Sequence, residues 1–278
     1  MAPLRERHEL RVRELLAPYL GHRAEGRSHP VIDFLFTYYN LKPGQLQRWH
    51  PGYGVVLTGG QVEAYAGRRG YIRTGDGVTV SRDYLIRRRS TIDYVADLLT
   101  ATASRPAVFG CFGLHEWAMV YETADVRHDS VPLRLGSAAT NAVVAAMPVR
   151  CTHYDAFRFF TDAARPLNAE WLTREGQVNH EQPGCLHAGM DLYRFTAKLL
   201  PLVDSDLLMD AFELAFAARE LDMKASPYDL SAWGYEAVRI ETPGGRAEYA
   251  RRQADLAQRA RPIRSALIDR CRVLMSVL

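Results

Sequence analysis

Residues 185–225 read CLHAGMDLYRFTAKLLPLVDSDLLMDAFELAFAARELDMKA. Apolar residues recur in this stretch at the three- and four-residue spacing of an α-helix. Asp204 or Ser205, which lie between its two halves, can cap a second helix. The stretch therefore predicts two successive helices, over 185–203 and 207–225, and with them a mostly helical fold.

The remainder of the chain favours the same fold class. Helical patterns cover 3–20, 31–40, 81–103, 137–146 and 246–277. The glycine-rich stretch 51–80 differs, because short β-branched runs and a Gly-Asp-Gly turn at 75–77 indicate strands. We expect a mainly α (α+β) protein, a single helical domain over residues 1–278 with a small β hairpin or sheet around residues 54–80.

The composition limits the class of function. The 278 residues carry a net charge of +3, with 47% hydrophobic and 24% charged residues, which argues against a polybasic protein and against extensive disorder. The four cysteines form no Cys-x-x-Cys pair, so a zinc knuckle is excluded. There is no signal-peptide pattern and no long uncharged apolar run. We therefore expect a cytoplasmic protein that does not enter a membrane.

The segment GCFGLHEWAMVYE (110–122) places His115 next to Glu116 within an apolar run. The run predicts a buried helix, on which neighbouring side chains point about 100° apart. Because Met119 stands where a His-Glu-x-x-His motif needs histidine, that zinc motif is excluded. His115 is then either a hydrogen-bonded core residue or a reactive group. We expect Glu116 to face a pocket and His115 to be satisfied internally or to meet His187.

His187 and Asp191 are four residues apart in the predicted helix 185–203, so they share one face of it. Such a pair can hold a metal ion, or the aspartate can orient the imidazole. A simple internal hydrogen bond that stabilises the helix is the alternative.

The segment CTHYDAFRFF (151–160) has His153 and Asp155 on either side of Tyr154. In a strand running into a helix, the histidine and the aspartate would share a face. Aromatic residues with polar tips are typical of small-molecule pockets, and they are equally typical of an ordinary core.

The segment HPVIDFLFTYYN (29–40) sets Asp33 in an apolar run that ends in Tyr38 and Tyr39. Bases stack on such rings in nucleic-acid-binding proteins. Ordinary helix packing accounts for the same pattern.

Several standard signatures are missing. The chain has no GxxxxGK[ST], no GxGxxG within a βαβ unit, no GxSxG and no deaminase HxE…PCxxC. P-loop chemistry and hydride transfer on a Rossmann fold are therefore disfavoured.

Four long phrases resemble one protein family. They are HPVIDFLFTYYNLKPGQLQRWHPGYG (29–54), TATASRPAVFGCFGLHEWAMVYE (100–122), QPGCLHAGMDLYRFTAKLLP (182–201) and SPYDLSAWGYEAVRIETPGGRAEY (226–249). The family is actinobacterial and is commonly labelled 3-methyladenine DNA glycosylase.

The resemblance implies an N-glycosylase that releases an alkylated purine from DNA, or that acts on a nucleobase-like small molecule, without a cofactor. One carboxylate can stabilise the oxocarbenium-like transition state, and aromatic walls can hold a flipped base. The candidate catalytic residues are Glu116, Asp191, His187 and His115. The candidate substrate-binding residues are Asp33, Tyr38, Tyr39, Trp117, His153, Tyr154 and Asp155.

Two other functions stay open. The first is an enzyme that acts on a small molecule through a divalent metal in a two-histidine, one-carboxylate site. Its candidate ligands are His115, His153 and His187 with Glu116 or Asp191. The second is a non-catalytic nucleic-acid-binding helical domain, in which arginines of the predicted last helix form a basic stripe. The sequence does not predict an oligomeric state.

Overall fold

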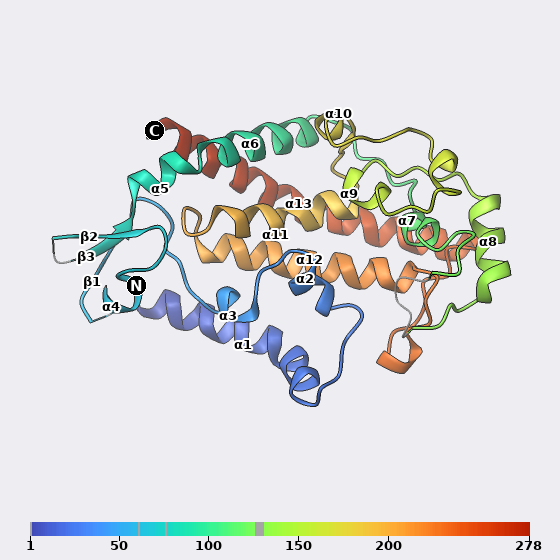
Figure 1. Cartoon of the computed structure of the whole chain (residues 1–278), viewed down its shortest axis with the longest axis horizontal. Coiled ribbons are helices and arrows are strands. Elements are labelled where there is room, and N and C mark those ends of the chain that lie inside the picture. The colour runs from blue at the N-terminus through green and yellow to red at the C-terminus, as the bar shows by residue number, and fades with distance from the viewer. Residues whose placement is uncertain (1, 61, 76, 126–130) are drawn as a thin grey trace.

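Two helices that lie side by side form the centre of the molecule (Figure 1). They are α11 (Leu186–Leu199) and α12 (Ser205–Ala225). The Asp204 carboxylate caps α12 by accepting a hydrogen bond of 3.0 Å from the backbone N–H of Leu207. The two successive helices and the cap between them are thus confirmed.

A computed structural model describes residues 2–60, 62–75, 77–125 and 131–278 of the chain. More than half of these residues are helical, which confirms the predicted fold class. The other helices are α1 (Ala2–Ala24), α2 (Asp33–Thr37), α3 (Pro43–Leu46), α4 (Val62–Tyr65), α5 (Arg82–Arg87), α6 (Arg89–Ala103), α7 (Leu114–Ala118), α8 (Gly136–Ala146), α9 (Tyr154–Phe157), α10 (Gln177–His180) and α13 (Pro243–Ser276). The strands are β1 (Val56–Thr58), β2 (Tyr71–Thr74) and β3 (Gly77–Val80).

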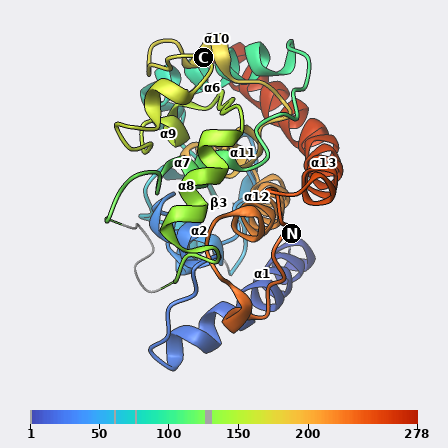
Figure 2. The same cartoon turned by 90° about the vertical axis from the view of Figure 1, so that its right-hand side faces the viewer.

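Helix α11 is enclosed by its neighbours. It contacts α12, α13 and α6, and the end-on view in Figure 2 shows it among them. Eleven of its 14 residues are buried. A helix that is buried around most of its circumference carries its polar residues into the interior as well. His187 and Asp191 are therefore core residues.

The three strands form a small antiparallel sheet with the order β1-β3-β2. In its register, Val56 pairs with Thr79, and Tyr71 pairs with Val80. The prediction of a small β element near residues 54–80 is confirmed, although residue 76 of the expected turn lies outside the described residues. In Figure 1 the sheet lies at the opposite end of the molecule from α7, α8 and α9.

The predicted buried helix of the stretch 110–122 is wrong in its extent. Only α7 (Leu114–Ala118) forms. Phe112 and Gly113 have positive φ angles of 51° and 73°, which a continuous right-handed helix does not allow.

The predicted strand at the start of 148–160 is also wrong. In place of the strand only an isolated bridge forms, between Val149 and Asn168, whereas the helix expected after it is present as α9. The Asn168 side chain accepts a hydrogen bond of 2.7 Å from the Cys151 N–H and donates one of 3.0 Å to the Cys151 carbonyl oxygen. An amide side chain thus takes the place of a neighbouring strand, and His153 and Asp155 do not alternate along a sheet.

Among the described residues, no helix combines the length and the apolar character that crossing a membrane requires.

Two adjacent glycines in the first turn of α13 provide a matched test of this packing. A Cβ on Gly245 would lie 1.9 Å from the carbonyl oxygen of Arg239, whereas a Cβ on Gly244 would have nothing within 4 Å. We predict that Gly245→Ala lowers the free energy of unfolding by about 1–3 kcal/mol, because the chain before α13 must move. Gly244→Ala should leave it unchanged or raise it by up to about 1 kcal/mol. Urea denaturation measures the free energy of unfolding of both variants. Equal changes in the two variants would contradict the close contact between residue 245 and Arg239.

Candidate metal centre

Three histidines from separate parts of the chain meet beside the N-terminal half of α11. His115 comes from α7, His187 from α11, and His153 from the residue before α9. The His115 and His187 ring centroids are 4.5 Å apart, and those of His153 and His187 are 5.2 Å apart. All three are at most 9% exposed. His187 therefore lies at the junction of two polar groups in the core.

The first group consists of His115, His187 and Asp222. One potential ligand atom from each lies within 4.8 Å of the others. His115 Nε2 is 2.7 Å from Asp222 Oδ1, and Asp222 is fully buried on α12. Ligand atoms on opposite sides of one ion are about 4.2 Å apart when each bond is about 2.1 Å long. The three groups thus lie close to the spacing that one transition-metal ion requires.

Arg219 holds this first group in place. Its Nη1 donates a hydrogen bond of 2.7 Å to Glu116 Oε1 and one of 3.2 Å to Asp222 Oδ2. Its guanidinium carbon also lies 4.2 Å from the centre of the Phe34 ring. Arg219 is only 1% exposed, so both carboxylates are needed to compensate its charge. Glu116 is therefore engaged by Arg219, while Asp222 is shared between Arg219 and His115.

The two imidazoles of the first group have opposite pKa shifts. Burial by itself lowers the pKa of His115, but the adjacent Asp222 carboxylate outweighs burial and raises it well above the ordinary value. Burial and the nearby charge of His115 lower the pKa of His187 well below the ordinary value. His187 is consequently neutral near pH 7, as a metal ligand must be.

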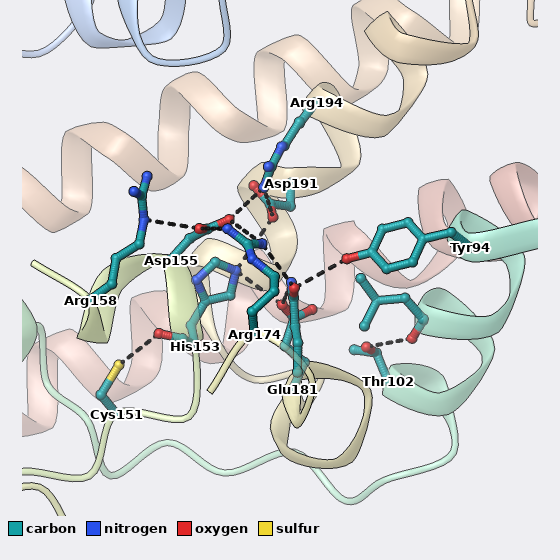
Figure 3. Close-up of polar contacts among 12 residues, drawn as sticks. Tyr94, Thr102, Cys151, His153, Asp155, Arg158, Arg174, Glu181, Asp191 and Arg194 are labelled. Atoms are coloured by element: carbon teal, nitrogen blue, oxygen red, sulfur yellow. Dashed lines mark hydrogen bonds and ion pairs between the residues drawn. The ribbon is translucent and has the colours of Figure 1, made fainter. Parts of the chain in front are cut away.

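The second group consists of His153, Glu181 and Asp191, all buried and all with ligand atoms within 4.8 Å of one another (Figure 3). His153 Nε2 is 3.2 Å from Glu181 Oε1 and 3.4 Å from Asp191 Oδ2. Neither contact has the alignment of a hydrogen bond, and within the described part of the chain His153 Nδ1 has no partner either. A buried imidazole without hydrogen bonds is costly, and an ion bound between these three groups would remove that cost.

Glu181 is held by the segment around it. Gln177 donates a hydrogen bond from its side chain to the Glu181 carboxylate, and Arg105 donates one of 2.7 Å to the Glu181 backbone oxygen. Burial raises the pKa of Glu181. Glu181 is thus held in position by Gln177 and by its own backbone. Among the described residues, no arginine forms an ion pair with its carboxylate.

Asp155 lies next to the second group and is surrounded by arginines (Figure 3). Arg174 Nη2 and Arg194 Nη1 each lie 2.6 Å from its carboxylate, and Arg158 Nε lies 3.1 Å away. Arg194 Nη1 is also 3.2 Å from Asp191 Oδ2. These guanidinium groups outweigh the effect of burial and lower the pKa of Asp155 to about 2. Asp155 therefore anchors Arg194, which in turn positions Asp191.

Four of the other predicted site residues contribute no ligand atom to the two histidine-carboxylate groups. The Trp117 indole is in the core and donates a hydrogen bond of 2.8 Å to the Ala225 carbonyl oxygen. Asp33 accepts a hydrogen bond of 3.1 Å from the backbone N–H of His29. The Tyr38 ring stacks on Phe34 at 4.8 Å, and Arg174 covers the Tyr154 ring at 4.7 Å.

Tyr39 lies nearer to the centre. Its ring meets the edge of Tyr193 at a centroid distance of 5.4 Å. Burial, followed by the charge of Asp191, raises the pKa of Tyr39 well above its ordinary value. Tyr39 is thus an uncharged, half-buried residue that packs against Tyr193.

Comparisons with protein-family models, curated proteins and solved structures found no match. The glycosylase function and the nucleic-acid-binding alternative stay predictions. The chemistry of the centre has to follow from its own residues.

Three residues of the centre were not predicted from the sequence: Asp222, Arg219 and Glu181. A signal for Asp222 was present, because Leu208, Ala215 and Asp222 are spaced by seven residues and share the buried face of α12. Glu181 carries no such signal, because it follows the four-residue helix α10 in a segment without a period.

The arginine cluster around Asp155 predicts a large loss of stability on neutralisation. Asp155→Asn should lower the free energy of unfolding at pH 7 by about 2–4 kcal/mol, less than for a fully buried pair because Arg158 and Arg174 regain water. Since the folded-state pKa is about 2 against an ordinary 3.8, this stability is present above pH 3.8 and is lost as the pH falls toward 2. The difference between wild type and variant should shrink over that range.

Urea denaturation at several pH values measures this difference. The matched control is Asp162→Asn, because the Asp162 side chain is 98% exposed in its pair with Arg165. The control should cost less than about 0.5 kcal/mol. A similar cost for both variants at pH 7 would contradict the account of Asp155.

Proposed function

We propose that the protein is a metal-dependent enzyme that acts on a small molecule, with a transition metal held by His115, His187 and Asp222. One observation carries the proposal: two imidazoles and a carboxylate from α7, α11 and α12 are buried with ligand atoms within 4.8 Å of one another. Two histidines and one carboxylate with open positions are the ligand set of non-haem iron(II) enzymes. Iron(II) is therefore the first metal to test, followed by manganese and zinc.

The second group supports a centre with two ions. His153, Glu181 and Asp191 offer one imidazole and two carboxylates, and the His153 ring stacks on the His187 ring of the first group. Carboxylate and imidazole ligands from facing helices are the usual way to build such centres inside helical proteins. Among the described residues, neither ring nitrogen of His153 makes an aligned hydrogen bond, although Nε2 lies between the Glu181 and Asp191 carboxylates, so an ion bound there would be coordinated by all three groups.

Two arginines next to the proposed ligands hold the ligand carboxylates in position. Arg219 binds the second oxygen of Asp222 and thereby fixes the direction of the first. Arg194 donates a hydrogen bond of 3.2 Å to Asp191 Oδ2, the oxygen that also lies 3.4 Å from His153 Nε2, and so holds that carboxylate in place. When bound, a transition metal would supply Lewis-acid or redox chemistry at this position. Burial of the ligands excludes bulk water and strengthens every charge interaction within the centre.

Metal binding should be coupled to proton release. Asp222 holds His115 in its protonated form, so the proton between His115 Nε2 and Asp222 Oδ1 must leave before that nitrogen can act as a ligand. Protons compete with the metal for His115 as the pH is lowered. Because the pKa of His115 is raised, the affinity for the metal should begin to fall at a higher pH than in a site made of ordinary histidines.

Metal content provides the direct test. Protein expressed without a histidine tag in medium with iron, manganese and zinc should contain about one to two equivalents of a transition metal by mass spectrometry. His187→Ala should remove most of it, because His187 adjoins both groups. His187 has no ion-pair partner among the described residues, so the variant is expected to fold, which circular dichroism checks.

The matched control is His180→Ala, which removes a half-buried histidine paired with Glu170 at 2.7 Å. This control should keep its metal. Less than about a tenth of an equivalent in wild type, against the near-stoichiometric content of a tight site, would reject the proposal. An equal loss in both variants would also reject the assigned ligands.

A further inference from the structure

A second feature lies on the other side of the segment that carries Glu181. It is a groove of about 510 Å³, lined by Ala254, Ala257 and Ile268 of α13 and by Ala107 and Phe109 of the chain after α6. The volume falls within the range of roughly 300–1,000 Å³ typical of small-molecule sites. Its mainly apolar lining suits a ligand with an apolar body.

One charged side chain of the groove is buried without a counter-charge. Arg264 is 3% exposed, and within the described part of the chain its Nε and Nη2 atoms have no hydrogen-bond partner. Burial lowers the pKa of Arg264, and the attraction of Glu181 and Cys185 offsets only part of that effect. An arginine nevertheless keeps its proton near pH 7. A buried guanidinium with unsatisfied donors costs free energy that an anion would recover.

The unsatisfied atoms specify the shape of that anion. Nε and Nη2 form one edge of the guanidinium, and this edge is closed to water in the structure. When the side chain turns toward the groove, the edge can donate two parallel hydrogen bonds to a carboxylate. None of the described residues that line the groove is acidic, and the exposed Arg261 adds a second positive charge. We propose that the groove binds a small molecule with an apolar body and a carboxylate head group, and that Arg264 receives the carboxylate.

The binding site is separate from the proposed metal ligands, although it adjoins them. Pro183 lines the groove and stands two residues after Glu181 of the second group. Arg264 and the Glu181 carboxylate attract each other without forming an ion pair in the described part of the chain. The groove does not depend on a bound metal, so metal-free protein should bind the ligand.

Calorimetry with three probes of equal chain length tests the charge requirement. Decanoate and decyltrimethylammonium, each below its micellar concentration, and decan-1-ol, below its solubility limit, are titrated into metal-free protein. Decanoate should bind most tightly and the cation most weakly. Arg264→Gln should weaken decanoate by roughly tenfold to a hundredfold, the value of a charge-assisted hydrogen bond, and change decan-1-ol by less than about threefold.

Two further variants keep the test decisive. Arg251→Gln removes an exposed arginine of α13 outside the groove and should leave decanoate binding unchanged. Ala254→Trp fills the groove and should weaken both decanoate and decan-1-ol. Because Arg264→Gln removes an unpaired buried charge, its urea midpoint should not fall, which separates lost binding from lost folding.

Three results would overturn the proposal. They are undetectable decanoate binding by wild type, equal decanoate binding by wild type and Arg264→Gln, and preference for the cationic probe. A second copy of the chain could instead cover the groove. In that case sedimentation would show a dimer that Ala254→Trp dissociates and decanoate does not, and this result would also overturn the proposal.

Discussion

The buried charge of Arg219 is the constraint on which the centre depends. A guanidinium that is 1% exposed must have its charge compensated inside the protein, and Glu116 of α7 and Asp222 of α12 provide that compensation. The two elements can therefore dock in essentially one way. Because His115 precedes Glu116 in the chain, the same docking brings the His115 imidazole to Asp222. An ion pair that fixes the packing of α7 also brings together two of the three proposed ligands, His115 and Asp222.

Charge balance explains how this centre can exist with and without a metal. With His115 protonated, the first group and its anchors contain two cations, His115 and Arg219, and two anions, Glu116 and Asp222. Exchange of the His115 proton for a divalent ion would raise the charge by one, a change that neighbouring carboxylates can absorb. His187 stays neutral in both cases, because its pKa is lowered. The centre is thus suited to exchange a proton for a metal ion.

Sequence patterns predicted the frame of the molecule better than its centre. The period of residues 185–225 predicted α11 and α12, and with α11 came the shared face of His187 and Asp191. The same logic failed at 110–122, where the positive φ angles of Phe112 and Gly113 shorten the helix. Asp222 was not predicted as a site residue, because a single charged residue at an apolar position of a helix does not indicate a buried site until its partner is known. Its partners, Arg219 on the same helix and His115 on α7, depend on tertiary packing that no local pattern encodes.

Anomalous diffraction from crystals of protein loaded with iron or manganese tests the central claim most directly. The account predicts a peak within about 2.0–2.3 Å of the facing atoms of His115, His187 and Asp222, at metal–ligand bonding distance. It also predicts that this peak disappears in the His187→Ala variant. Loaded crystals that show density only at outlying pairs such as His180 and Glu170, with nothing between the three buried groups, would contradict it.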